Sequence, residues 1–226
     1  MAVVFAIVTF LLFVGIDYLL QRRAATASAT DRVEVPSAGG LLPALEPVWV
    51  AGYQFHDKLH YHGGHTWVRS LGGDLVAVGM DDFARKLLGN MKQIKLPAVG
   101  AWLEQGGETM AVEAGKRHAS LVSPVNGEVV EVNREVRSNA SIAGQDPYGH
   151  GWLFKVRVGN LSANLRNLLS GSLAKRWFED SREQLEHRLM AATGSVLQDG
   201  GEPAPNFAEQ LEAEDWRELV RQFLLT

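Results

Sequence analysis

The chain has 226 residues, a formal net charge of −4, and hydrophobic and charged fractions of 46% and 21%. These values are typical of a globular protein with one domain plus appendages, or at most two small domains, and they exclude a chain disordered over its whole length. No long run of Lys and Arg is present, so we expect no nucleic-acid partner. The absence of cysteine excludes disulfides, thiolate zinc sites and a nucleophilic cysteine, so redox sulfur must come from an attached group.

The N-terminal segment has the composition of a membrane element. Residues 2–20 are almost entirely apolar or glycine, interrupted by Asp17, and two arginines follow. About 20 such residues cross one bilayer, and positive charge after the segment places the rest of the chain in the cytoplasm. We therefore expect a transmembrane anchor over residues 1–22, a linker over residues 23–49 and a single-pass membrane protein whose domain faces the cytoplasm. A cleaved signal peptide is the alternative, supported by the small residues at 25–29.

From about Tyr61 onward, short apolar alternations broken by glycine predict a β-rich domain. We expect short strands at residues 65–68, 75–79, 91–96, 109–113, 120–122, 128–132 and 152–158. Strands at such regular spacing indicate a sandwich or barrel. Asp81 and Asp82 supply the start of a short inserted helix, and Gly89 supplies its end. Residues 123–127, which contain Pro and Asn-Gly, predict a turn before the next strand.

Lys116 is the most informative residue of this region. It lies between two predicted strands, directly after Gly115, and a glycine there permits a tight reversal that leaves the next side chain at an exposed tip. Such a lysine is free to be modified, although a merely solvated loop lysine is the alternative. The spacing around it is distinctive: Gly100 lies 16 residues before it, Glu113 three before it and Gly127 eleven after it.

These positions and the short sequence motifs around them resemble the glycine cleavage system H protein, a lipoyl carrier of the barrel-sandwich hybrid family. The matching stretches are residues 65–68, 78–84, 88–89, 95–100, 112–113 with Lys116, 123–133 and 146–153. They run in order over about half the chain. The resemblance implies a mainly β, lipoyl-domain-like barrel-sandwich hybrid over residues 50–180, with a short inserted helix and a C-terminal helix that covers the barrel.

The resemblance also implies that Lys116 carries lipoic acid through an amide bond, with Glu113, Gly100 and Gly127 contributing to recognition and hairpin geometry. The protein would then be a non-catalytic carrier that shuttles an aminomethyl or related group and reducing equivalents. The implied partners are lipoate-attaching enzymes, a pyridoxal-phosphate decarboxylase, a folate-dependent aminomethyltransferase and a flavin dihydrolipoyl dehydrogenase. The two redox sulfurs would belong to the cofactor, which suits a chain without cysteine.

The sequence departs from the family pattern around the acceptor. Gly115 stands where the family usually has Val, and Arg117 and His118 stand where it has two small residues. A membrane-anchored H-like adaptor or scaffold without the cofactor is therefore one alternative. A periplasmic efflux adaptor is another, although such proteins usually separate their two half-motifs with a long helical hairpin. Biotin fits less well, because biotin acceptors typically have methionine on both sides of the lysine.

Four histidines, His56, His60, His62 and His65, are close together in the sequence, but no carboxylate or cysteine completes a recognised ligand spacing. We expect them to be solvated or hydrogen-bonded, with no metal site. No catalytic motif is found either.

The end of the chain is predicted to be helical. From Leu161 a stripe of leucines predicts a helix continuing to about Ala192, and residues 181–226 are expected to form a helical C-terminal extension. Its last segment, residues 208–225, is amphipathic. We expect it either to pack on its own domain or to dock in a partner's groove.

Overall fold

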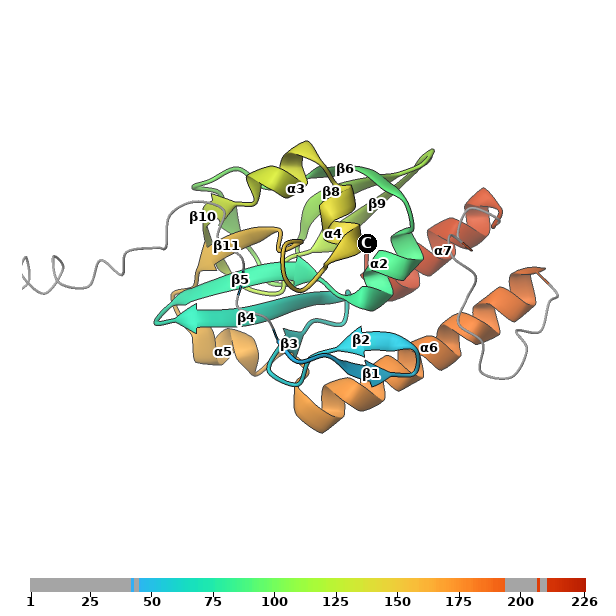
Figure 1. Ribbon diagram of the computed structural model, residues 1–226, viewed down its shortest axis with the longest axis horizontal. Helices are drawn as coiled ribbons and strands as arrows, with labels where there is room; N and C mark the ends of the chain where they lie inside the picture. Colours follow the sequence, from blue (N-terminus) through green and yellow to red (C-terminus); the bar gives the residue numbers. More distant parts are fainter. Residues whose placement is uncertain (1–41, 43–44, 194–206, 208–210) are drawn as a thin grey trace, which may run out of the picture. The chain divides into compact units, whose positions relative to one another are not determined.

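The computed structural model describes residue 42, residues 45–193, residue 207 and residues 211–226, and Leu41–Thr226 form one compact unit (Figure 1). The strands are β1 (Val48–Val50), β2 (Tyr53–Phe55), β3 (His60–Tyr61), β4 (Thr66–Gly72), β5 (Leu75–Met80), β6 (Met91–Lys95), β7 (Trp102–Leu103), β8 (Glu108–Ala114), β9 (Arg117–Val122), β10 (Gly127–Val132) and β11 (Phe154–Arg157). The helices are α2 (Asp82–Leu88), α3 (Arg134–Ser138), α4 (Ser141–Gln145), α5 (Leu161–Leu165), α6 (Gly171–Thr193) and α7 (Ala213–Leu224).

Antiparallel strands build three sheets. The largest has the strand order β3-β4-β5-β11-β10-β7, the second has the order β6-β8-β9, and β1 pairs with β2 alone. Every residue of β5 is buried, because this strand lies in the middle of the largest sheet. Trp67 is fully buried on the neighbouring strand and packs directly over Gly79, where a Cβ atom would lie 2.3 Å from the indole ring. The core of the domain therefore lies against this sheet.

The predicted inserted helix is confirmed as α2. The Asp81 carboxylate accepts a hydrogen bond from the Ala84 amide at 2.8 Å, which caps the first turn. Gly89 follows the last turn with a φ of +68°, and its amide donates to the Arg85 carbonyl oxygen. The local sequence signals were sufficient here because both caps act within four residues of the helix ends.

Several predicted strands shift in the structure. β9 begins at Arg117, three residues earlier than the alternation predicts, so β8 and β9 pair up to the turn. β1, β2, β3 and β7 were not predicted, since strands of two or three residues are too short to show an alternation.

The single helix predicted after Leu161 is wrong, because the chain leaves the helix between α5 and α6. There Leu169 pairs its backbone with Tyr61, each amide donating to the other's carbonyl oxygen at 2.8 Å. Gly171 starts α6 with a φ of +55°, and Leu173 is 61% exposed instead of lying on the buried stripe. The interruption has a tertiary cause, since Tyr61 lies more than 100 residues earlier in the chain.

The last helix packs on its own domain. In α7, the buried residues are Trp216, Leu219, Val220, Phe223 and Leu224. Phe223 lies 5.1 Å from Phe83 between ring centroids, and the Thr226 hydroxyl donates to the Ser120 carbonyl oxygen of β9 at 3.3 Å. Self-packing, the first of the two expectations for this segment, is confirmed.

The expected fold class needs a correction. It included a transmembrane helix over residues 1–22, which lie outside the described residues. Within the part of the chain that the structure describes, none of the helices has the length and apolarity needed to cross a membrane. Even α6, with 23 residues, is interrupted throughout by charged side chains. The fold class of the described residues is therefore mainly β with helices, and the expected single-pass location with a cytoplasm-facing domain, which depended on that helix, is corrected with it.

Candidate functional site

The hairpin of β8 and β9 ends in a two-residue turn made of Gly115 and Lys116 (Figure 1). The last paired residues are Ala114 and Arg117. Gly115 has a φ of +65° whereas Lys116 does not have a positive φ, which is the pattern of a type II′ turn with glycine at its first central position. This turn suits the right-handed twist of the two strands, so the sequence itself determines that Lys116 occupies the tip.

The surroundings of Lys116 fit a long acyl group on its amine. The side chain is exposed, and a Cβ atom added to Gly115 would meet no other atom within 4 Å. The amine of Lys116 is therefore accessible to an enzyme that joins a group to it. Within the described residues, no hydrogen bond or ion pair holds the Lys116 side chain.

Glu113 lies close to this tip on β8. It is paired across the hairpin with His118 of β9, which is exposed. Its carboxylate also lies 3.7 Å from Nζ of Lys95 on the adjacent strand β6. Since both groups are partly exposed, this ion pair adds little stability. Lys95 therefore has a carboxylate partner, whereas Lys116 has none among the described residues.

Gly100 and Gly127 lie elsewhere. The Gly100 amide donates to the Val129 carbonyl oxygen at 2.7 Å, and Gly127 pairs with Leu103 at the start of β10. Both positions belong to the β7 and β10 region of the largest sheet, which Figure 1 shows away from the tip of the β8–β9 hairpin. The structure therefore brings Glu113 to the candidate acceptor but places the two glycines in the packing of the other sheet.

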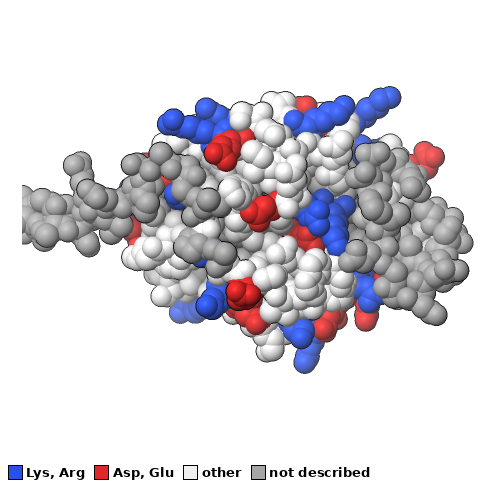
Figure 2. Space-filling model, in the orientation of Figure 1, with Lys and Arg blue, Asp and Glu red and all other residues white. Residues whose placement is uncertain are grey.

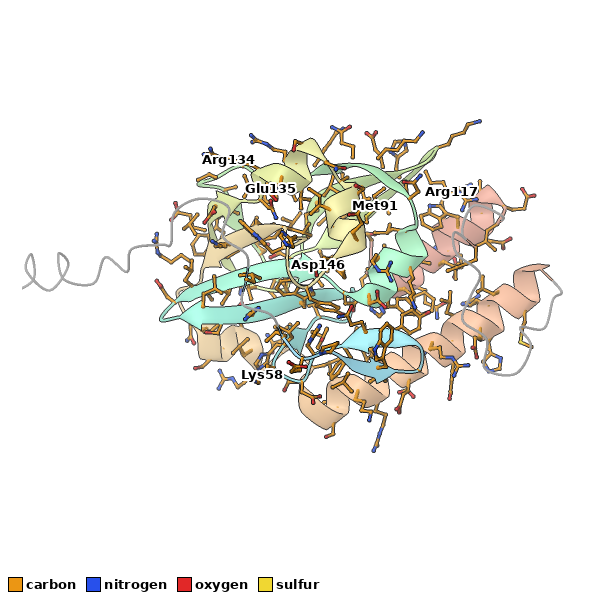
Figure 3. All side chains as sticks on the ribbon, in the orientation of Figure 1. Lys58, Met91, Arg117, Arg134, Glu135 and Asp146 are labelled. Atoms are coloured by element: carbon orange, nitrogen blue, oxygen red, sulfur yellow. The ribbon has the colours of Figure 1, made fainter. Side chains whose placement is uncertain are left out.

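Sequence reasoning missed one neighbour of the acceptor, the start of α7. Nη2 of Arg117 donates to the Leu211 carbonyl oxygen, and the guanidinium carbon lies 5.1 Å from the ring centroid of Trp216. Figure 3 shows Arg117 between the hairpin and the helix. A signal existed in the sequence, since an arginine directly follows the candidate lysine and the last amphipathic segment contains a tryptophan, Trp216. Nothing local shows that the two residues meet.

The clustered histidines are distributed over separate environments. His65 is buried, with Nδ1 2.8 Å from an Asp81 carboxylate oxygen and its ring stacked at 4.0 Å on Phe83. Burial raises the pKa of Asp81, and the adjacent His65 opposes this effect. His56 is also buried, with Nδ1 3.0 Å from the Glu46 carbonyl oxygen, and its pKa is lowered chiefly by desolvation.

Burial likewise lowers the pKa values of His60 and His62. In the described part of the chain, no three His, Asp or Glu side chains are grouped so that they could hold a metal ion.

The fold and the site together define a carrier domain: a β-structure that presents one lysine on a tight turn. The face drawn in Figure 2 carries positive and negative side chains interspersed, without one large area of a single sign. Long-range attraction by that face is therefore weak, and partners depend on local contacts.

Comparison with known proteins assigns the family. The family model described as "Glycine cleavage H-protein" matches residues 59–181. The glycine cleavage system H protein of Rippkaea orientalis is 41% identical over 119 residues, covering 53% of this chain and 89% of that protein. The H protein of Carboxydothermus hydrogenoformans is 38% identical over 125 residues, covering 55% of this chain and 95% of that protein. A crystal structure of an H protein from Mycobacterium marinum is 26% identical, with a TM-score of 0.49, and covers 57% of this chain and 99% of that one.

The chain belongs to the glycine cleavage H-protein family. It is therefore a lipoyl carrier and not itself an enzyme, and its cofactor is a covalently attached lipoate. The predicted family, the non-catalytic role and the cofactor are thus confirmed. Family membership also implies the glycine cleavage enzymes as its class of partner.

Proposed function

We propose that Lys116 is the lipoyl attachment residue and that the chain shuttles an aminomethyl or related group, together with reducing equivalents, between partner enzymes. The observation that carries this proposal is the turn: Lys116 is the exposed second residue of a two-residue loop whose glycine has open space around it. Glu113, three residues before it on the same hairpin, is within reach of an enzyme that binds the tip, and we assign it to recognition.

Attachment requires little of the protein beyond presentation. Nζ of Lys116 bonds to the carboxyl carbon of lipoate, the leaving group of the acyl donor departs with the bonding electrons, and the amine gives up a proton. The amide removes the charge of the lysine and lengthens an arm that already extends from the tip. When attached, the lipoyl group supplies a disulfide that accepts the transferred group and two electrons, for which this cysteine-free chain has no group of its own.

The hairpin keeps the arm's base fixed while the arm moves. β8 is paired with β6 on one side and with β9 on the other, as far as Ala114. A fixed base with a flexible arm lets one carrier visit several active sites at a high effective concentration. We propose as these sites a lipoate-attaching enzyme, a decarboxylase, an aminomethyltransferase and a dihydrolipoyl dehydrogenase. We propose in addition that residues 50–180 form the carrier domain and that residues 181–226 form a helical extension of it.

The test is the intact mass of the protein purified from lipoate-replete cells of its native host. We expect the mass of one lipoyl group on the wild type, none on Lys116→Ala, and an unchanged modification on Lys95→Ala. Lys95 is the matched control because it is an exposed lysine on the adjacent strand. Unmodified wild-type protein, or modification that persists in Lys116→Ala, contradicts the proposal. The first outcome favours an H-like adaptor that works without the cofactor.

A further inference from the structure

The candidate acceptor hairpin is supported differently on its two sides. β8 is flanked by β6, whose Met91 pairs with Ala114 immediately before the turn. Among the described residues, β9 is the outer strand of this sheet and has no further strand beside it. An outer strand has unpaired backbone groups and bends more easily than a central one. The position of the tip therefore depends on what covers β9.

The C-terminal segment provides that cover. The Thr226 hydroxyl donates to the Ser120 carbonyl oxygen in the middle of β9, and Arg117, at the start of β9 next to the turn, contacts Leu211 and Trp216. The two contacts join the start and the middle of β9 to the segment that contains α7. The family match ends at residue 181, whereas α7 begins at Ala213, so this cover is an addition to the matched domain.

The interactions of Arg117 indicate that this residue fixes the position of the hairpin relative to α7. Its guanidinium gains a charge-assisted hydrogen bond to Leu211 and the attraction of the Trp216 ring. Against this, Nη1 is buried with no hydrogen-bond partner within the described part of the chain, and desolvation of that group is unfavourable. The unpaired Nη1 takes away only part of this gain, so Arg117 makes a modest net contribution that acts locally on the hairpin. The contact nevertheless has only one good geometry, because the planar guanidinium must meet both a carbonyl oxygen and a ring face.

We propose that Arg117 is a positioning residue that fixes the acceptor hairpin to the start of α7, so that Lys116 is presented at a constant place beside this helix. This inference rests on the proposed role of Lys116. An enzyme that acylates Lys116 then meets the turn and α7 as one surface. Without the contact, the turn still forms but its position varies, and the enzyme binds the correct arrangement only part of the time.

The test combines hydrogen–deuterium exchange with the kinetics of attachment. In Arg117→Ala, we expect the amides of residues 114–120 to exchange about tenfold faster, since one charged hydrogen bond and one cation–π contact are lost locally. With a lipoate-attaching enzyme, ATP and lipoate, we expect the KM for the carrier to rise about fivefold and kcat to stay within about twofold. A general loss of structure would lower the melting temperature and expose the whole domain to exchange instead.

Two further variants sharpen the result. Trp216→Leu keeps an apolar side chain but removes the ring, and the exchange effects of Arg117→Ala and Trp216→Leu should be non-additive in the double variant, because both remove the same contact. Arg134→Ala is the control, since Arg134 is an exposed arginine at the start of α3 that Figure 3 shows away from Arg117. It should change neither the exchange nor the KM.

The outcomes separate this inference from the proposed function. Hairpin exchange is measured on unmodified protein, so it reports on the Arg117 contact even if Lys116 is never acylated. Unchanged exchange in Arg117→Ala, fully additive effects in the double variant, or a KM that stays at the wild-type value would each overturn the positioning role. Failure of acylation on the wild type would instead overturn the assignment of Lys116.

Discussion

Replacing Gly127 by alanine separates a packing role from a recognition role at this position. Gly127 starts β10 with a φ of +156°, and a Cβ atom there would lie 2.3 Å from the Arg157 carbonyl oxygen and 2.6 Å from Val156 Cγ1. The first of these atoms is backbone, so no change of rotamer relieves the contact. β10 must move away from β11, to which it is paired.

The cost can be worked out from these contacts. Overpacking of a well-filled interior costs about 1–3 kcal/mol. The unfavourable backbone conformation adds on the order of 1 kcal/mol for a residue with a Cβ atom. We therefore expect Gly127→Ala to lower the free energy of unfolding by about 3 kcal/mol. For a domain of this size, that is a decrease in melting temperature of roughly 6–12 °C.

Urea unfolding and thermal melts measure the change, and Gly159→Ala is the matched control. A Cβ atom at Gly159 would meet nothing within 4 Å and its φ is not positive, so alanine there should be neutral or slightly stabilising. Because Gly127 lies in the other sheet, Gly127→Ala should still be lipoylated at the wild-type rate well below its melting temperature. Wild-type stability of Gly127→Ala, or a slow attachment rate in the folded variant, would refute this reasoning.

Two other predictions concern α7 and pH. Phe223 is 4% exposed and packs on Phe83, so Phe223→Ala should lower the free energy of unfolding by about 3–5 kcal/mol in urea melts, whereas Leu173→Ala, at a 61% exposed position, should change it by less than about 0.5 kcal/mol. Burial lowers the pKa of His56 in the folded protein, so the unfolded chain binds more protons and stability is lost as pH falls below about 6.5. The decrease in unfolding free energy from pH 7.5 to 5.5 should therefore be smaller in His56→Gln, and an equal or larger decrease would contradict this origin.

Short-range signals in the sequence were enough for the elements that depend on neighbouring residues. Asp81 and Gly89 delimit α2 because a cap acts on amides and carbonyls within one turn. Gly115 places Lys116 at the tip because a two-residue turn needs a positive φ at its first position. The order and spacing of matching sequence motifs over about half the chain also indicated the family, and the match to the family model confirmed it.

Long-range contacts were decided only by the tertiary structure. Leu169 leaves the helical pattern because Tyr61 offers it a pair of backbone hydrogen bonds. Arg117 contacts Leu211, which lies 94 positions later in the sequence, and a hydrophobic periodicity does not indicate a contact between residues so far apart. The spacing of a pattern reports which face of an element is apolar. What covers that face depends on the free energy of packing all elements together, which is why the hairpin could be found from the sequence and its attachment to α7 could not.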